Sequence, residues 1–273
     1  MKELAARLSE WSPDAPPVAC VQIMDVRGST PRESGAFMLI GERWQAGTIG
    51  GGCLEWDCVH QARTLLQRGE TDWSHRFVLG PETGQCCGGR VDVRITRMDA
   101  ALAACLQQQL TGQQEAWPVL VLFGAGHVGR ALARALAPLP LRLIWVDPRA
   151  EEFGTVPEGV DARVTSDWEH VLAEVPAGSG VLVLTPNHSL DALIVAAALE
   201  RGDLSYVGLI GSRTKRRRFE ASFREIGLPE ERIASLICPI GDRGVRDKRP
   251  EIIAALVAAE LIERFLPHPP QAA

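Results

Sequence analysis

The sequence predicts an α/β protein of two domains, in which a smaller N-terminal α+β domain precedes a C-terminal Rossmann-like domain with a parallel sheet. Three observations support this fold class. Apolar, strand-like runs alternate with helical patterns in the second half, which is typical of a parallel sheet. A glycine-rich turn directly follows the first of these runs. The length of 273 residues also favours two domains over one.

The second half carries the clearest strand and helix signals. It opens with an apolar strand at 118–123, then a glycine turn and a helical pattern that Pro138 and Pro140 end. Further strands are expected at 141–147, 181–185 and 206–210. Pro250 suits the first turn of a last helix. A buried apolar stripe on that helix is predicted from Ile253, Val257, Leu261 and Phe265.

The first half predicts strands and one long helix connected by loops. The two first strands, 18–26 and 36–40, flank the loop RGSTPRESG, and a hairpin follows at 41–42. A helix over 53–68 is expected to place Leu54, Val59, Ala62 and Leu66 near one face. Strands at 75–79 and 91–95 are expected to pair across a loop that contains two cysteines.

The predicted domain boundary is the segment GQQEAWP at 112–118, which separates two stretches of different character. The domains are therefore expected at 1–111 and 118–273. No internal repeat or low-complexity segment is visible on either side.

Composition excludes several classes of protein. Hydrophobic residues make up 46% and charged residues 23%, as in soluble globular chains. A net charge of -5 argues against a general nucleic-acid binder. No apolar run is long enough to span a membrane, and the N-terminal sequence lacks the apolar core of a signal peptide. We therefore expect a cytoplasmic protein without a membrane or nucleic-acid partner.

The seven cysteines do not form a disulfide framework, because their number is odd and their spacing is irregular. We expect reduced thiols. Small buried hydrophobic residues are predicted at Cys20, Cys58, Cys105 and Cys238, since free cysteine is commonly buried. The other three cysteines adjoin glycine runs.

The glycine turn of the second half has the pattern GxGxxG. Gly124, Gly126 and Gly129 lie between a strand and a helix, where glycine permits close approach of the backbone to a phosphate. Asp147 ends the next strand, where its carboxylate can accept hydrogen bonds from ribose hydroxyls. The alternative is that the glycines only pack the helix against the strand. His127 either faces a phosphate or caps the loop.

A second turn with the features of a phosphate site occurs at Gly211, Ser212 and Arg213. It follows a predicted strand and precedes a helix, so that backbone amides, a hydroxyl and a guanidinium would converge. The basic run 215–218 is interpreted as a solvated helix face, which leaves Arg213 as the better ligand candidate.

A triple-glycine run precedes the first helix. Gly50, Gly51 and Gly52 stand directly before Cys53, so that free amides and the helix dipole would favour the thiolate of this cysteine. A thiolate can act as a nucleophile or as a soft metal ligand, which suits molybdenum and sulfur chemistry. Glu55 is either part of the same site or a carboxylate stabilised by the helix dipole. An incidental cysteine after a glycine turn is the remaining alternative.

A second loop contains Cys86 and Cys87, followed by Gly88 and Gly89, and presents thiols together with open amides. Zinc is a competing ligand, but the chain has no CxxC pair and His75 lacks the spacing of a zinc finger. A disulfide between the adjacent cysteines would be strained.

Five motifs of the chain together resemble those of the XdhC/CoxI family of molybdenum cofactor handling proteins. The paired cysteines resemble the XdhC branch of the family, and the motifs extend over most of the chain. They are GSTPRESGAFML, GTIGGGCLE, GQCCGGRVDV, LFGAGHVGRALA and YVGLIGSRTKRRRF.

The resemblance implies an accessory protein, or chaperone, and not an enzyme. Such a protein binds molybdenum cofactor in its molybdopterin form, helps it acquire a terminal sulfur from a cysteine desulfurase, and delivers it to a xanthine dehydrogenase-type molybdoenzyme. Cys53 and the CCGG loop would lie near this cofactor, with Cys53 in contact with molybdenum or sulfur. The glycines of the second half would hold a nucleotide or the phosphate of the cofactor.

Two departures from the family pattern concern the second half. Pro186 stands where relatives often carry a histidine, which puts a role for His188 in doubt, and the tail GDRGVRDKRPEI is more charged than usual. Two other functions remain open: an NAD(P)-dependent oxidoreductase, supported by the glycine turn and Asp147, and a redox-sensing adaptor that uses Cys86 and Cys87. A homodimer is the expected assembly.

Overall fold

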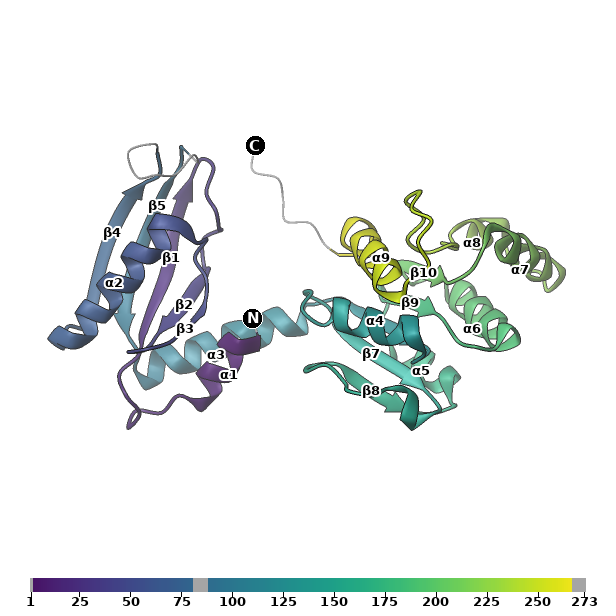
Figure 1. Ribbon diagram of the computed structural model, residues 1–273, viewed down its shortest axis with the longest axis horizontal. Helices are drawn as coiled ribbons and strands as arrows, with labels where there is room; N and C mark the ends of the chain where they lie inside the picture. Colours follow the sequence, from purple (N-terminus) through teal and green to yellow (C-terminus); the bar gives the residue numbers. More distant parts are fainter. Residues whose placement is uncertain (1, 81–87, 267–273) are drawn as a thin grey trace. The chain divides into compact units, whose positions relative to one another are not determined.

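The computed structural model describes residues 2–80 and 88–266 (Figure 1). The chain forms two compact units, residues 1–113 (unit 1) and 114–273 (unit 2). Helix α3, Ala100–Glu115, crosses the division between the units, so that part of the segment predicted as a boundary at 112–118 is helical. Among the described residues, no helix is both long and apolar enough to span a lipid bilayer.

Unit 1 contains a five-stranded antiparallel sheet in the order β3-β2-β1-β5-β4. Strands β4 and β5 pair antiparallel, with Val78 opposite Arg90, on either side of the cysteine loop, as the sequence predicts. The strands are β1 (Ala19–Arg27), β2 (Phe37–Ile40), β3 (Gln45–Gly47), β4 (Asp72–Val78) and β5 (Arg90–Arg97).

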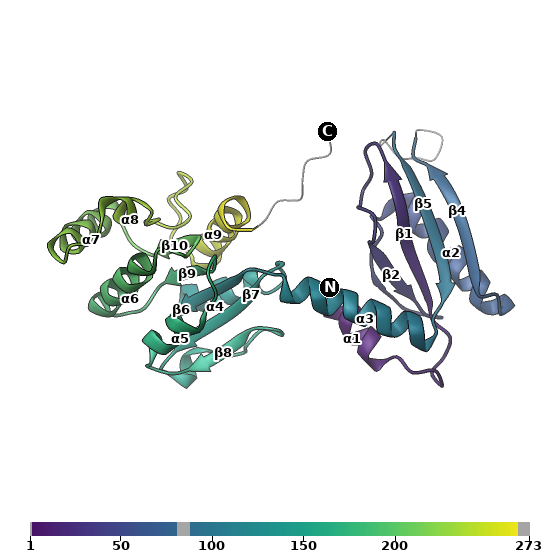
Figure 2. The same cartoon turned by 180° about the vertical axis from the view of Figure 1, so that it is seen from behind.

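Helices cover both faces of this sheet. The residues of β1 alternate: Val21 and Ile23 pack under helix α2 (Gly52–Arg68), whereas Cys20 faces helices α1 (Lys2–Glu10) and α3. Figure 2 shows unit 1 from the side opposite to Figure 1, with β1 and β5 at the centre of the sheet. Two separate apolar clusters therefore lie on the two faces, whereas β4 and the polar side of β5 stay largely open to solvent.

Unit 2 is a parallel five-stranded sheet in the order β10-β9-β6-β7-β8 (Figure 1). Every pair in this sheet is parallel, which confirms the predicted fold class. The strands are β6 (Val119–Phe123), β7 (Arg142–Asp147), β8 (Asp161–Val164), β9 (Gly180–Val183) and β10 (Tyr206–Leu209). The order reverses at β6, because β7 and β9 lie on its two sides, and ligands of such sheets bind at this reversal.

The helices of unit 2 also divide between the two faces of their sheet. The apolar side chains of α4 and α9 pack with one face, and those of α5, α6, α7 and α8 pack with the other. The predicted stripe is buried at Val257, Leu261 and Phe265 and half-buried at Ile253, and Glu260 is buried beside it. The helices are α4 (His127–Leu136), α5 (Trp168–Glu174), α6 (His188–Arg201), α7 (Arg213–Glu225), α8 (Glu230–Ala234) and α9 (Pro250–Arg264), with a short 3-10 helix η2 at Ala150–Glu152.

The sequence-based expectations omit α1, α3 and β8. Strand β8 has no buried residue, so that it lacks the apolar run by which the other strands of unit 2 were identified. Helix α3 carries glutamines on much of its surface and buries only Ala103, Leu106 and Leu110, which gives a weak amphipathic pattern.

Candidate functional site

Three motif loops of unit 1 meet at one end of its sheet. The β1–β5 pairing sets Arg27 opposite Arg90, so the loop after β1 and the glycines before β5 are neighbours. Gly89 is buried, and a Cβ atom on it would lie 2.2 Å from the carbonyl oxygen of Ser29. On the other side, a Cβ atom on Gly50 would lie 2.5 Å from the ring of Pro31. Glycine is required at Gly89 because the two backbones touch there, and at Gly50 because the Pro31 ring fills the space and φ is 124°.

Glu55 organises the triple-glycine loop. One carboxylate oxygen, Oε2, accepts hydrogen bonds from the hydroxyl of Thr48 (2.5 Å), the N–H of Ile49 (3.0 Å) and the N–H of Gly51 (3.1 Å). The backbone φ angles of Gly50, Gly51 and the following Gly52 are all positive, which favours glycine there. Glu55 therefore positions the loop, in the geometry of a carboxylate near a helix N-terminus.

Cys53 is the second residue of α2 and is exposed. Gly51 is the N-cap and has no side chain that could accept from the first N–H groups of α2, while its own N–H donates to Glu55. By contrast, Cys58 is fully buried one turn later, and burial, with Asp57 and Glu55 adding to it, raises the pKa of its thiol to about 12. The structure thus separates one accessible thiol at an open helix start from one protonated thiol in the core.

Two grooves flank the triple-glycine loop. A groove of about 580 Å³ includes Pro31, Arg32 and Thr48, and a second one of about 310 Å³ includes Gly52 and Trp56. Trp56 is 69% exposed and stacks on His60, with ring centroids 5.8 Å apart and planes within 6°. Neither Arg32 nor Trp56 was predicted, although Arg32 stands within the motif GSTPRESGAFML and Trp56 directly follows the motif GTIGGGCLE.

Cys86 and Cys87 lie outside the described residues. Of the glycines that follow them, Gly88 is exposed and Gly89 is buried, and the carbonyl of Gly89 accepts a hydrogen bond of 2.7 Å from the N–H of Leu79. The described end of the CCGG motif therefore reaches the loop after β1.

The predicted glycine turn of unit 2 joins β6 to α4, and its three glycines differ in what requires them. Gly124 has a φ of 115°, and a Cβ on it would lie 2.4 Å from the carbonyl oxygen of Leu184. A Cβ on Gly129 would lie 2.1 Å from the carbonyl oxygen of Gly124. Gly126 has an ordinary φ and nothing within 4 Å of such an atom. Helix–strand packing thus requires Gly124 and Gly129, whereas space beside Gly126 is open.

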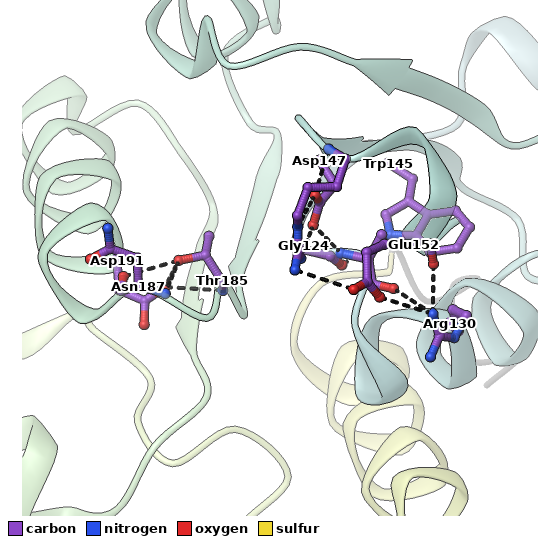
Figure 3. Close-up of polar contacts among 10 residues, drawn as sticks. Gly124, Arg130, Trp145, Asp147, Glu152, Thr185, Asn187 and Asp191 are labelled. Carbon is purple, nitrogen blue, oxygen red and sulfur yellow. Dashed lines mark hydrogen bonds and ion pairs between the residues drawn. The ribbon is translucent and has the colours of Figure 1, made fainter. Parts of the chain in front are cut away.

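The start of α4 is free of side-chain caps among the described residues, and its first residue, His127, is exposed. Asp147 lies beside Gly124 at the end of β7 (Figure 3). Its carboxylate accepts a hydrogen bond from the N–H of Ala125 (2.8 Å) and is held by the Arg149 guanidinium at 2.9 Å through each oxygen. Hydrogen bonding of a ribose to Asp147 therefore requires Arg149 to share or leave this carboxylate.

Electrostatics keep Asp147 ionised. Burial alone would raise the pKa of this carboxyl, but the hydrogen bonds from Arg149 and from the N–H of Ala125 outweigh burial and hold the pKa below its usual range. Arg149 also contacts Glu152, which in turn pairs with Arg130 of α4 (Figure 3). Arg149 stands only two residues after the predicted acidic residue, where the sequence could have indicated it.

A pocket of about 270 Å³ opens at the carboxyl ends of the parallel strands. Its lining includes Gly124 and Asp147 on one side of the reversal in strand order, and Thr185 and Asn187 on the other (Figure 3). Crevices at this edge, where the strand order reverses, are the usual ligand sites of open α/β sheets. Asn187 caps α6, and His188 is the first residue of that helix, with an exposed ring.

The second predicted turn, after β10, is occupied by internal contacts. The Ser212 hydroxyl accepts a hydrogen bond from the N–H of Lys215, and Arg213 pairs with Asp242 at 3.1 Å. A Cβ on Gly211 would meet the Lys215 side chain at 2.8 Å. The amides of this turn are therefore less available to a ligand than those of the turn at Gly126.

The expectation that Lys215 belongs to a solvated helix face is wrong. Its ammonium group donates to the carboxylate of Asp191 at 2.7 Å and to the carbonyl of Ile210 at 3.0 Å. Asp191 is fully buried, and its other oxygen accepts hydrogen bonds from Thr185. The long side chain reaches inward because a buried carboxylate requires a partner. The pair ties the α7 start to the loop that lines the strand-end pocket.

The predicted burial of four cysteines is correct for Cys20, Cys58 and Cys238 and wrong for Cys105, which is exposed on α3. Among the described residues, no group of three or more histidine, cysteine, aspartate or glutamate side chains could hold a metal ion. The chemistry-bearing residues of the described chain thus gather at the glycine loops and not at a preformed metal centre.

The fold and these loops define a class of two-unit protein, in which an antiparallel unit with an exposed cysteine after a glycine run precedes a Rossmann-type unit. Residues 120–261 match the model of the XdhC Rossmann domain, and residues 11–77 match that of the XdhC and CoxI family. The chain therefore belongs to the XdhC and CoxI family, which confirms the resemblance seen in its motifs.

Two relatives extend this comparison. The uncharacterised protein YqeB of Escherichia coli (strain K12) is 30% identical over 279 residues, which cover 95% of this chain and 45% of YqeB. The chain thus spans less than half the length of that relative. A solved structure described as a xanthine dehydrogenase from Bacillus halodurans has a TM-score of 0.75 at 21% identity, over 96% of this chain and 94% of that one. This likeness shows a shared fold.

Proposed function

We propose that this protein assists the maturation of a xanthine dehydrogenase-type molybdoenzyme. In this proposal it binds molybdenum cofactor as cargo at the loops of unit 1, keeps it accessible for sulfuration by a cysteine desulfurase, and passes it to the enzyme. The observation that carries the proposal is the meeting of three motif loops around an accessible thiol, Cys53, in a chain of the XdhC and CoxI family.

The groups at these loops suit the chemistry of such a cargo. A cysteine thiolate is a soft ligand that suits molybdenum, and it can take the outer sulfur of a desulfurase persulfide, releasing the donor's thiolate, and then pass that sulfur on. The open start of α2 offers backbone N–H groups and the positive end of a helix dipole to phosphate or oxo groups. The exposed face of Trp56 can stack against a flat heterocycle such as a pterin. Arg32, which has no partner among the described residues, supplies a guanidinium for a phosphate.

The role of unit 2 in this proposal is to hold a phosphate-bearing part of a ligand at the turn formed by Gly124, Gly126 and Gly129. The open space beside Gly126 and the uncapped start of α4 support a phosphate there. That ligand is either the cofactor itself or a separate nucleotide.

The test compares two serine variants of exposed cysteines in unit 1. Cys53→Ser replaces the thiol with a hydroxyl that stays protonated near neutral pH, and we expect cofactor content per chain to fall sharply after co-production with the cofactor biosynthesis machinery. Cys105→Ser is the matched control, because Cys105 is equally accessible but lies on α3. Content is measured as molybdenum and as pterin fluorescence, at matched melting temperature. Equal, undiminished loading of both variants would remove Cys53 from the site.

A second candidate function is an NAD(P)-dependent oxidoreductase. The observation that favours it is the pocket beside Gly124 and Asp147, at the edge where nucleotides bind in such sheets. Purified protein with a nicotinamide cofactor and candidate hydroxy or aldehyde substrates would be followed at the absorbance of the reduced nicotinamide. Turnover by protein that contains no molybdenum cofactor would favour this function over the accessory role.

A further inference from the structure

Unit 2 contains an arginine-lined groove that shares no residue with the pocket at the glycine turn. It has a volume of about 650 Å³ and lies at the β10 edge of the sheet, where Ile237 pairs with Gly208. Its floor is the segment 235–239, and its walls are α7 and α9. The arginines that line it are Arg213, Arg216 and Arg217 of α7 and Arg264 of α9.

Each carboxylate of the groove is already engaged. Asp242 pairs with Arg213 at 3.1 Å, and Glu220 pairs with Arg216 at 2.6 Å. Glu260 accepts one hydrogen bond of 2.6 Å from the hydroxyl of Tyr206 and another of 3.2 Å from a backbone N–H. Asp242 and Glu220 are thus each paired with one arginine, whereas Glu260 is hydrogen bonded to neutral donors and keeps its negative charge within the groove.

The guanidinium groups of Arg217 and Arg264 form no hydrogen bond or ion pair with any residue in the ranges 2–80 and 88–266. Both are exposed, and they reach the groove from different helices, α7 and α9. Two guanidinium groups without an ion pair in one groove repel one another, and the four arginines of the lining exceed its three carboxylates, so the groove favours an anion.

The start of α7 adds to this positive field. The helix begins with RTKRRR and has no acidic residue in its first turn. A helix N-terminus stabilises anions and disfavours cations, so this order of charges is locally unfavourable. An anion bound near the start of α7 would offset the unfavourable energy of these basic residues at a helix N-terminus.

We propose that this groove binds a phosphorylated small molecule, with Arg217 and Arg264 on its phosphate oxygens. Guanidinium groups bind phosphate through two parallel hydrogen bonds, which favours phosphate over simple halide or monodentate anions. The volume is in the range of small-molecule sites and exceeds the need of a single inorganic phosphate. A diphosphate, free or as part of a nucleotide, fits this space and charge. The site is independent of the cargo site proposed for unit 1.

The experiment is calorimetric titration of the full chain at low ionic strength with inorganic pyrophosphate and, separately, with adenosine diphosphate. We expect the wild-type protein to bind at least one of the two probes. Arg217→Gln and Arg264→Gln should each weaken that binding about tenfold or more, because a hydrogen bond to a charged group is lost. Comparison of the two probes distinguishes a free diphosphate from a nucleotide.

Arg218→Gln is the matched control, because Arg218 neighbours Arg217, is exposed, carries the same charge and does not line the groove. This variant should bind like the wild type. Three results would overturn the proposal. They are absence of binding to the wild type, unchanged binding by the Arg217 and Arg264 double variant, and equal weakening in Arg218→Gln, which would indicate unspecific attraction.

Discussion

Replacement of Gly129 by alanine should destabilise unit 2 strongly, because the new methyl group has no space. Its Cβ would lie 2.1 Å from the carbonyl oxygen of Gly124 and 3.0 Å from the carbon of that carbonyl. The oxygen cannot withdraw freely, because it accepts a hydrogen bond of 3.0 Å from the indole N–H of the buried Trp145. The helix must therefore separate from the strand, or the hydrogen bond must break.

The magnitude follows from three contributions. Overpacking in a close-packed core costs about 1–3 kcal/mol. Loss of the buried hydrogen bond costs about 1–3 kcal/mol more. Alanine regains at most about 1 kcal/mol over glycine through helix propensity. We therefore expect the free energy of unfolding to fall by about 1–5 kcal/mol, which lowers the melting temperature of a unit of this size by about 2–20 °C.

Gly126→Ala provides the control within the same turn. An expectation from the GxGxxG pattern alone would be that both variants damage the domain. The structure changes this expectation, since Gly126 has an ordinary φ and open space at the position of a Cβ. At an N-cap, alanine in place of glycine costs well under 2 kcal/mol.

The assay is thermal unfolding followed by circular dichroism, together with urea unfolding to obtain the free energy. Gly129→Ala should melt far below the wild type, whereas Gly126→Ala should melt within a few degrees of it. A Gly129→Ala protein with the melting temperature of the wild type would refute the close packing described at this turn. If a phosphate binds at the open space, Gly126→Ala should weaken that binding despite its stable fold.

Two further predictions concern buried charges of unit 2. Lys215→Met keeps the apolar stem but leaves the fully buried Asp191 without the lysine ammonium group, and we expect the free energy of unfolding in urea to fall by about 3 kcal/mol. Arg218→Met, on the exposed face, should change this free energy little. Equal effects of the two variants would contradict the pairing of Lys215 with Asp191. The pKa of Asp147 is depressed in the folded state, so its contribution to stability is present above the unfolded value of about 3.9 and is lost as the pH falls below it. Wild-type unfolding free energy should therefore drop more steeply than that of Asp147→Asn below about pH 4, and parallel curves would show that Asp147 is not stabilised by its partners.

Local patterns of the sequence determined much of the fold. Strands β6, β7, β9 and β10 are runs of apolar residues that are long enough to be buried on both faces, which identifies a parallel sheet without knowledge of its neighbours. The glycine turn between β6 and α4 is equally local, since the backbone itself requires Gly124 and Gly129. Family membership also follows from contiguous motifs. These features depend on residues that are close in the chain, and a sequence displays such residues directly.

Tertiary structure alone decided which side chains become partners. The basic run around Lys215 predicts a solvated helix face, but the Lys215 ammonium group donates a hydrogen bond to the buried carboxylate of Asp191, 24 residues earlier in the chain. The approach of Gly89 to Ser29 depends on the pairing of β1 with β5, which are separated by three other strands and a helix in the sequence. The position of Arg264 in the arginine-lined groove depends on where α9 packs against the sheet. Burial and strand order set these contacts, and both arise from long-range packing that no local pattern encodes.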